Sequence, residues 1–188
     1  MLRSLVPLVY AKAMTLNRTV ALVGMMGAGK TSLGRRLAAR LEVPFRDADH
    51  EIETAAGLTV SEIFAKFGEP YFRDGERRVI ARLLGEPPHV LATGGGAFMD
   101  PTTRAAMKDG SLTVWLKAPL HVLVSRVKKR DTRPLLRDGD VKETIEKLLK
   151  EREPFYAQAD ITLECGDESQ HSAVDQIVAA LRERGLET

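Results

Sequence analysis

The chain has 188 residues, 44% of them hydrophobic, and its 28 basic and 26 acidic side chains leave a formal charge of +2. This length supports one hydrophobic core, and no apolar run approaches the roughly 18 residues that a membrane span needs. The balanced charge argues against a protein that binds nucleic acid by neutralising phosphates, and the single cysteine, Cys165, fits a reducing, cytoplasmic compartment.

The first 17 residues contain basic side chains and no acidic one, since the first carboxylate of the chain is Glu42. We expect residues 1–17 to be a disordered N-terminal extension and residues 18–188 to form a single domain. A start codon upstream of the true one, with Met14 as the other start, is an alternative explanation of the extension. A remnant of a targeting segment is the weaker alternative.

Residues 20–32 form an apolar strand followed by glycines, a lysine and two hydroxyl side chains. Gly24, Gly29, Lys30 and Thr31 match the G-x-x-x-x-G-K-[ST] spacing, in which backbone N–H groups at the start of a helix bind phosphates. We call residues Gly24–Thr31 the phosphate loop. Lys30 is predicted to reach the β- and γ-phosphates of a nucleotide, and Thr31 to hold Mg²⁺. The nucleotide-binding residues predicted from the motif are Gly27, Ala28, Gly29, Lys30, Thr31 and Ser32.

Two carboxylates follow in a predicted strand over Val43–Asp49. An extended backbone would point Asp47 and Asp49 to the same side, at the carboxyl edge of the sheet where ligands bind. Neither of the two later strands ends in an acid, so Asp47 is predicted to hold the metal through water and Asp49 to face a substrate hydroxyl. Capping of a helix from His50 to Ala56 is the alternative.

A capping box at Thr59 and Glu62 predicts a helix that ends at Gly68, and a second helix runs from about Pro70 to Leu84. Arg73 and Glu76 lie one turn apart on the second helix. An arginine held by a glutamate is oriented for a planar carboxylate, although the spacing alone favours a solvated salt bridge.

Three consecutive glycines, Gly94–Gly96, follow the next strand and predict backbone pressed against a ligand, with a loose loop as the alternative. We call them the glycine turn. Residues 128–140 are charged and turn-rich and include Arg133, which predicts a lid over the nucleotide; a basic turn or nucleic-acid patch is less consistent with the absence of interleaved aromatics. The other predicted elements are helices over 31–41, 101–108, 119–130, 141–157 and 172–184 and strands over 89–93, 112–116 and 161–163.

Taken together, these motifs resemble those of shikimate kinases over about residues 19–181. The resemblance rests on motifs in a fixed order: the phosphate loop, Asp47-x-Asp49, Phe72-Arg73 with Glu76, the glycine turn, Arg133-Pro-Leu-Leu136 and Arg152-x-x-x-Tyr156. It implies an α/β P-loop kinase of the nucleoside monophosphate kinase type, with a five-stranded parallel sheet flanked by helices. It also implies a substrate-binding segment over about 49–84 and a lid.

The resemblance further implies that the γ-phosphoryl group of ATP is transferred to the 3-hydroxyl of shikimate, with Mg²⁺ as cofactor, in aromatic amino acid biosynthesis. Asp49 would meet that hydroxyl, while Arg73, Gly95 and Arg152 would hold the rest of the substrate, chiefly its carboxylate. Arg133 would touch the phosphates and Arg126 would lie against adenine. Lys30, Asp49 and Arg133 are the predicted catalytic residues. No exposed apolar helix face requires a partner, so we expect a monomer.

Three other functions compete with this prediction. A gluconate or nucleoside monophosphate kinase would keep the phosphate loop but need other acceptor residues. A GTP-binding switch would need an Asn-Lys-x-Asp guanine reader, whereas the one asparagine, Asn17, precedes Arg18. A nucleotide-gated interaction module without catalysis would release no ADP in the presence of an acceptor.

Overall fold

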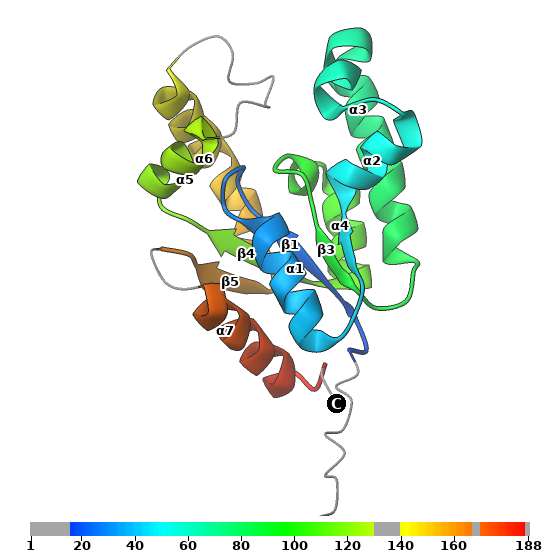
Figure 1. The fold of residues 1–188 in the computed structure, drawn as a ribbon, viewed down its shortest axis with the longest axis vertical. Helices are drawn as coiled ribbons and strands as arrows, with labels where there is room; N and C mark the ends of the chain where they lie inside the picture. The colour runs from blue at the N-terminus through cyan, green and yellow to red at the C-terminus, as the bar shows by residue number, and fades with distance from the viewer. Residues whose placement is uncertain (1–15, 130–139, 167–169, 187–188) are drawn as a thin grey trace, which may run out of the picture.

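The structure is a computed structural model that describes residues 16–129, 140–166 and 170–186. Within these ranges, five parallel strands form one sheet in the order β2-β3-β1-β4-β5 (Figure 1). The predicted α/β fold with a five-stranded parallel sheet is therefore confirmed. The strands are β1 (Thr19–Val23), β2 (Phe45–Asp47), β3 (Val90–Ala92), β4 (Ser111–Lys117) and β5 (Ile161–Glu164).

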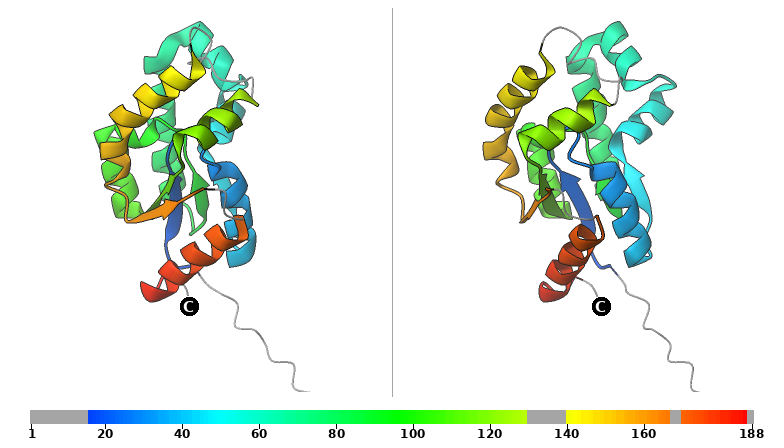
Figure 2. Two further views of the ribbon diagram at one scale, coloured as in Figure 1. Left: turned by 90° about the vertical axis from the view of Figure 1, so that its left-hand side faces the viewer. Right: turned by 60° about the vertical axis from the view of Figure 1, so that its left-hand side comes forward.

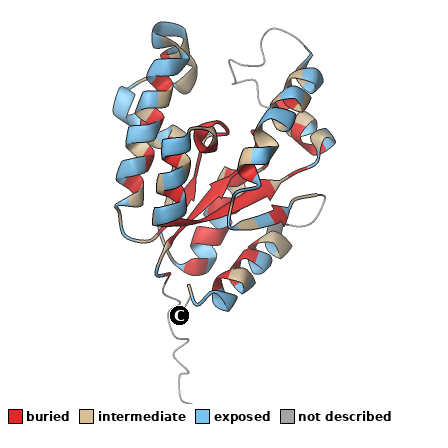
Figure 3. Ribbon diagram, turned by 180° about the vertical axis from the view of Figure 1, so that it is seen from behind, coloured by how far each residue is buried: buried red, intermediate tan, exposed pale blue. Residues whose placement is uncertain are grey.

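Helices cover both faces of this sheet. Figure 1 shows α1 and α7 in front of the strands, and the opposite view in Figure 3 shows α4 and the end of α3 in front of them. The strands between these layers are mostly buried; all five residues of β1 are, and this places the core around the central strand. The helices are α1 (Lys30–Leu41), α2 (Ala48–Ala56), α3 (Val60–Leu84), α4 (Pro101–Gly110), α5 (Leu120–Lys128), α6 (Val141–Tyr156) and α7 (Gln170–Glu183), with a 3-10 turn η1 (Ala97–Met99).

The β1–α1 unit directs the phosphate loop to the carboxyl edge of the sheet. Helix α1 packs on the sheet through Leu33, Leu37 and Leu41, which recur at helical spacing and are buried. The helix begins after Gly29, whose φ of 98° lies in the left-handed region that glycine adopts without a steric penalty. The loop therefore presents its backbone N–H groups at the N-terminus of a helix that is fixed to the core.

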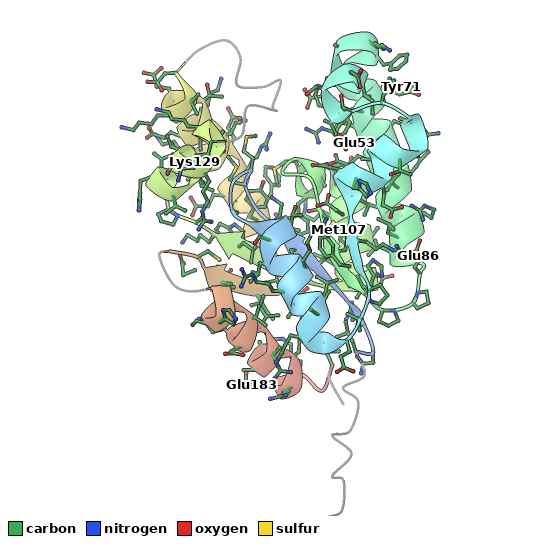
Figure 4. All side chains as sticks on the ribbon, viewed as in Figure 1. Glu53, Tyr71, Glu86, Met107, Lys129 and Glu183 are labelled. Atoms are coloured by element: carbon green, nitrogen blue, oxygen red, sulfur yellow. The ribbon has the colours of Figure 1, made fainter. Side chains whose placement is uncertain are left out.

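Two helical arms rise beyond this edge on either side of the loop (Figures 1 and 2). One arm consists of α2 and the outer part of α3 around Gly68, and the other of α5 and α6. Figure 4 shows Tyr71 near the outer end of the first arm and Lys129 on the second. The first arm has a small apolar cluster of its own, in which the rings of Phe64 and Phe72 lie 4.7 Å apart beside Ile63.

Helix α3 contains the break that the sequence predicts. The capping box is present, with Thr59 accepting from the backbone of Glu62 and Glu62 from that of Thr59. Gly68 leaves helical geometry, with φ 80° and ψ 172°, two residues before Pro70. The chain therefore bends there, and the second part of α3 turns Arg73 and Glu76 toward the glycine turn.

Two sequence-based expectations need correction. The strand predicted over Val43–Asp49 is only Phe45–Asp47, because Asp47 caps α2 and places Asp49 in its first turn. The extended-backbone argument for the two carboxylates is therefore wrong for Asp49. At the N-terminus, Leu16 is buried in the main core and Asn17 bonds to the backbone of Gly185 and Leu186, so the domain begins no later than Leu16. Residues 1–15 lie outside the described ranges.

Candidate active site

The phosphate loop is held closed by its own lysine. Lys30 is buried, and its Nζ donates to the carbonyl oxygens of Gly24 and Met25 at 2.7 and 2.9 Å. Gly24 has a φ of 135°, and a Cβ there would lie 2.7 Å from the carbonyl oxygen of Leu116. The loop therefore needs glycine at this position, and its lysine sits at the centre of the curved backbone, where a phosphate would bind.

Asp47 joins the phosphate loop to α2. Its Oδ2 accepts from the Thr31 hydroxyl at 2.8 Å, and its Oδ1 accepts from the backbone N–H of Asp49 at 3.2 Å. One oxygen therefore caps α2, and the other meets the hydroxyl predicted to hold the metal; the metal role of Asp47 stays a prediction. Asp49, in the first turn of α2, lies beside them.

A cavity of about 390 Å³ opens over these residues. It brings the predicted nucleotide residues except Ala28 together with Asp47, Asp49 and Gly95, which come from two later parts of the chain. The combined lining matches a site for a phosphorylated nucleotide beside a second ligand. Its residues are Gly27, Gly29, Lys30, Thr31, Ser32, Asp47, Asp49, Thr93, Gly95, Arg126, Val127 and Lys129.

Arg73 and Glu76 pack directly on the glycine turn. Nη1 of Arg73 donates to Oε2 of Glu76 at 2.7 Å, and Glu69 accepts from the same guanidinium at 3.0 Å. A Cβ on Gly96 would lie 2.5 Å from Nη2 of Arg73, and one on Gly94 would clash with Oε1 of Glu76 and lie 3.0 Å from Oδ1 of Asp49. A side chain at either glycine would therefore have to displace the ends of these charged side chains from their present positions.

The carboxylate of Glu76 is buried and only partly hydrogen-bonded. Its side chain is 3% exposed, and Oε1 has no hydrogen-bond partner among the described residues. Burial raises the pKa of Glu76, Arg73 opposes the rise, and nearby Asp49 adds to it. Burial alone would lower the pKa of Arg73, but its ion pairs with Glu76 and Glu69 outweigh burial and leave that pKa raised. Arg73 therefore stays charged beside a carboxylate that is poorly solvated.

Gly95 receives two donors from α6. Nη1 of Arg152 donates to its carbonyl oxygen at 3.2 Å, and the Tyr156 hydroxyl donates to the same oxygen. Together, Arg73 on Gly96 and Arg152 on Gly95 place two guanidinium groups on consecutive residues. Such a pair is suited to a carboxylate, which guanidinium groups bind with strong, charge-assisted hydrogen bonds.

Arg126, on α5, lies on the opposite side of the phosphate loop. Its Nη1 is 3.4 Å from the carbonyl oxygen of Gly27 and 3.3 Å from that of Ala28. It lines the main cavity and also a smaller hollow with Ala28, Gly29 and Cys165. Its guanidinium therefore lies beside the phosphate loop. A nucleotide whose phosphates bind to the loop would extend toward this guanidinium.

The predicted site residues thus gather around one edge of the sheet, except those beyond the described ranges. Arg133 and residues 130–139 of the predicted lid are not described, so their role stays a prediction. Sequence reasoning did not single out Thr93, Val127 or Lys129 as cavity residues. For Tyr156, its place one turn after Arg152 was the available signal.

Comparison with known proteins agrees with this geometry. The family model described as shikimate kinase matches residues 26–182. The chain belongs to the shikimate kinase family. A shikimate kinase of Caulobacter vibrioides is 55% identical over 166 residues, which cover 88% of this chain and 83% of that protein. The resemblance inferred from the ordered motifs is therefore confirmed.

Solved structures of the shikimate kinase family share the fold. The enzyme of Acinetobacter baumannii, solved in complex with shikimate, has a TM-score of 0.86 and 36% identity, covering 89% of this chain and 94% of that one. A gluconokinase from Sinorhizobium meliloti has a TM-score of 0.57 at 16% identity, covering 89% of this chain and 93% of that one. The latter likeness concerns the fold alone.

Among the helices that the structure describes, none combines the length and apolar character that crossing a bilayer demands.

Proposed function

We propose that this protein transfers the γ-phosphoryl group of ATP to the 3-hydroxyl of shikimate. The products would be ADP and shikimate 3-phosphate, and the latter would serve the biosynthesis of aromatic amino acids. The observation that carries the proposal is the meeting of the phosphate loop, Asp49 and Gly95 around one cavity. Membership of the shikimate kinase family and the shikimate bound to the Acinetobacter relative support it.

The acceptor would be held by side chains that converge on the glycine turn. Arg73 and Arg152 lie against Gly96 and Gly95 and would bind the substrate carboxylate from two directions. Asp49 would orient the attacking hydroxyl and take its proton, because its carboxylate lies in the same cavity as Lys30.

On the nucleotide side, Lys30 would leave the carbonyl oxygens of Gly24 and Met25 and contact the β- and γ-phosphates. Arg126 would lie against adenine, and Arg133 would add positive charge to the transferring group. Holding the two reactants in line and neutralising the phosphoryl oxygens would account for most of the rate increase.

We further propose that the metal is Mg²⁺. Thr31 and Asp47 offer a hydroxyl and a carboxylate oxygen 2.8 Å apart, which are hard oxygen donors of the kind that Mg²⁺ prefers. Within the described ranges, no cluster of three or more His, Cys, Asp or Glu side chains could enclose a metal. This fits an ion held mainly by phosphate and water, with Thr31 as direct ligand and Asp47 acting through water. When bound, the metal would neutralise charge on the phosphates.

The test is a coupled assay of ADP release with shikimate, gluconate and nucleoside monophosphates as separate acceptors. We expect ADP release that depends on shikimate and stays near background with the others. Preference for another acceptor would overturn the substrate assignment, and equal release without acceptor would indicate an ATPase.

Four broader expectations belong to the same proposal. We expect a cytoplasmic monomer that uses small-molecule substrates and does not bind nucleic acid. Size-exclusion chromatography with light scattering tests the oligomeric state. A dimer that persists at micromolar concentration would contradict the expected monomer.

A further inference from the structure

Tyr156, the last residue of α6, contacts both the glycine turn and the phosphate loop, although it does not line the main cavity. Its side chain is 1% exposed, and its hydroxyl donates to the carbonyl oxygen of Gly95. The same hydroxyl oxygen lies 3.9 Å from Sδ of Met25. Gly95 belongs to the glycine turn and Met25 to the phosphate loop. One side chain therefore touches the two loops that would hold acceptor and donor.

These two loops lie against each other where Tyr156 reaches them. A Cβ on Gly95 would lie 3.3 Å from the backbone nitrogen of Met26 and 3.6 Å from the carbonyl oxygen of Gly24. The glycine turn thus packs directly on the backbone of the phosphate loop, with no side chain between them. A small shift of Gly95 would change the spacing between the two loops.

A second contact holds the other end of the same segment. Nη1 of Arg104, on α4, donates to the carbonyl oxygens of Phe98 and Met99 at 2.9 and 3.1 Å. Its guanidinium carbon lies 5.0 Å from the ring centroid of Phe155, the neighbour of Tyr156 on α6. Segment 95–99 is therefore held at its start by Tyr156 and at its end by Arg104, and both contacts involve the end of α6.

The Tyr156 ring is itself fixed. The ring of Trp115, on β4, stacks with it at a centroid distance of 6.0 Å. Burial raises the pKa of Tyr156 to about 12, so the hydroxyl keeps its proton and remains a donor at neutral pH. A satisfied core tyrosine would show the same burial, but it would not need to bridge two functional loops.

We propose that Tyr156 is a positioning residue for phosphoryl transfer, which sets the spacing between the glycine turn and the phosphate loop, and that Arg104 fixes the far end of the same segment. The inference rests on the proposed function, since the spacing matters because acceptor and donor bind to the two loops. A misplacement of about 1 Å can cost about a hundredfold in rate when two reactants must be aligned.

The principal test is Tyr156→Phe, which removes the hydroxyl and leaves the ring. We expect the ratio kcat/KM for shikimate to fall about three- to tenfold, the range for loss of one neutral hydrogen bond. The Kd of ATP, measured by calorimetry without shikimate, should stay within twofold because Arg126 and the phosphate loop backbone are unchanged.

Ser111→Ala is the matched control. Ser111 is fully buried, and its hydroxyl donates to the carbonyl oxygen of Met107 at 2.5 Å, at the end of β4 away from the site. This variant loses the same kind of buried bond. We expect Tm to fall in both variants and kcat/KM to fall only in Tyr156→Phe.

Arg104→Gln and Arg104→Lys test the second contact independently, also if Tyr156→Phe fails to fold. We expect Gln to reduce kcat/KM for shikimate several-fold, and Lys to recover part of the loss because it can still donate to the two carbonyl oxygens. Unchanged shikimate kinetics in the folded variants, with Tm lowered as in Ser111→Ala, would overturn the positioning role. Absence of shikimate-dependent ADP release from the wild-type protein would instead overturn the proposed function.

Discussion

The phosphate loop is built from consecutive residues, whereas the groups around the glycine turn come from α2, α3 and α6. In the loop, Lys30 is bonded to carbonyl oxygens only five and six residues away. At the turn, Gly95 is bonded to side chains 57 and 61 residues away. The first half can form wherever a strand, a loop and a helix follow one another, while the second requires the whole domain to be folded.

The two halves also differ in how their charges are balanced. Lys30 donates to two neutral carbonyl oxygens within the loop, and it can exchange these bonds for bonds to phosphate oxygens. Arg73 is paired with Glu76, whose second oxygen has no partner among the described residues. Loss of Arg73 would therefore remove the ion-pair partner of a buried carboxylate.

The largest effect is expected for Lys30→Met. Removal of the ammonium group takes away a preorganised positive charge at the phosphates, so kcat should fall by roughly 10² to 10³. The fold should persist, because α1 still packs through its leucines. Steady-state kinetics and a thermal melt check both points, with Lys108→Met, an exposed change on α4, as control. A rate near that of the wild type would remove Lys30 from the mechanism.

The next effect falls on the other half of the site. Arg73→Ala should weaken shikimate binding by about 10- to 100-fold, the scale for losing a hydrogen bond to a charged group, and leave ATP binding within twofold. Calorimetry with each ligand separately measures both. Arg77→Ala is the control, since Arg77 lies one turn further on, is 44% exposed and pairs with Asp74. Weakened ATP binding with shikimate binding intact would reverse the assignment of the two halves.

Asp47 lies where the two halves join, and Asp47→Asn separates its two interactions. Asparagine caps a helix about as well as aspartate, so Tm should change little. The Mg²⁺ concentration for half-maximal activity should rise about tenfold or more, the range for losing a group that acts on a metal through water. Asp100→Asn is the control, because Asp100 caps α4 by accepting from Thr103 at 2.7 Å outside the cavity. An equal Mg²⁺ requirement in both variants would limit Asp47 to capping.

The same contrast explains how much could be predicted from the sequence. The phosphate loop, the capping box at Thr59 and the break at Gly68 depend on neighbouring residues, and the structure contains all three. The clash that a Cβ on Gly94 would make with Glu76, and the bond from Tyr156 to Gly95, depend on how α3 and α6 pack on the sheet. Only the ordered resemblance to a family could link such distant residues, because no local pattern encodes their contact.

The sequence spacing alone also predicted too little burial for the ion pair of Arg73 and Glu76 on α3. It favoured a solvated salt bridge for Arg73 and Glu76, yet Glu76 is 3% exposed. Helical spacing shows that two side chains can meet, but it does not show which side of the helix another element covers. That information resides in the packing of the second part of α3 against the glycine turn.

The smallest effect concerns the pH dependence of stability that this burial creates. Burial raises the pKa of Glu76 above its ordinary value of 4.5, against the opposing effect of Arg73. The folded protein then binds this proton more tightly than the unfolded chain does. The stability that Glu76 contributes is therefore fully present below pH 4.5 and is lost as the pH rises through its folded pKa. The variant Glu76→Gln has no such titration.

The difference in Tm between the wild type and Glu76→Gln should therefore shift in favour of the variant as the pH rises from 4.5 toward 7. Groups that titrate alike in both proteins cancel in this difference. Glu69→Gln is the control for the ion pair, because Glu69 pairs with the same guanidinium at 3.0 Å but is 51% exposed. A shift in favour of the wild type would mean that attraction to Arg73 outweighs burial. The ion pair with Arg73, rather than burial, would then decide how the charge of Glu76 affects stability.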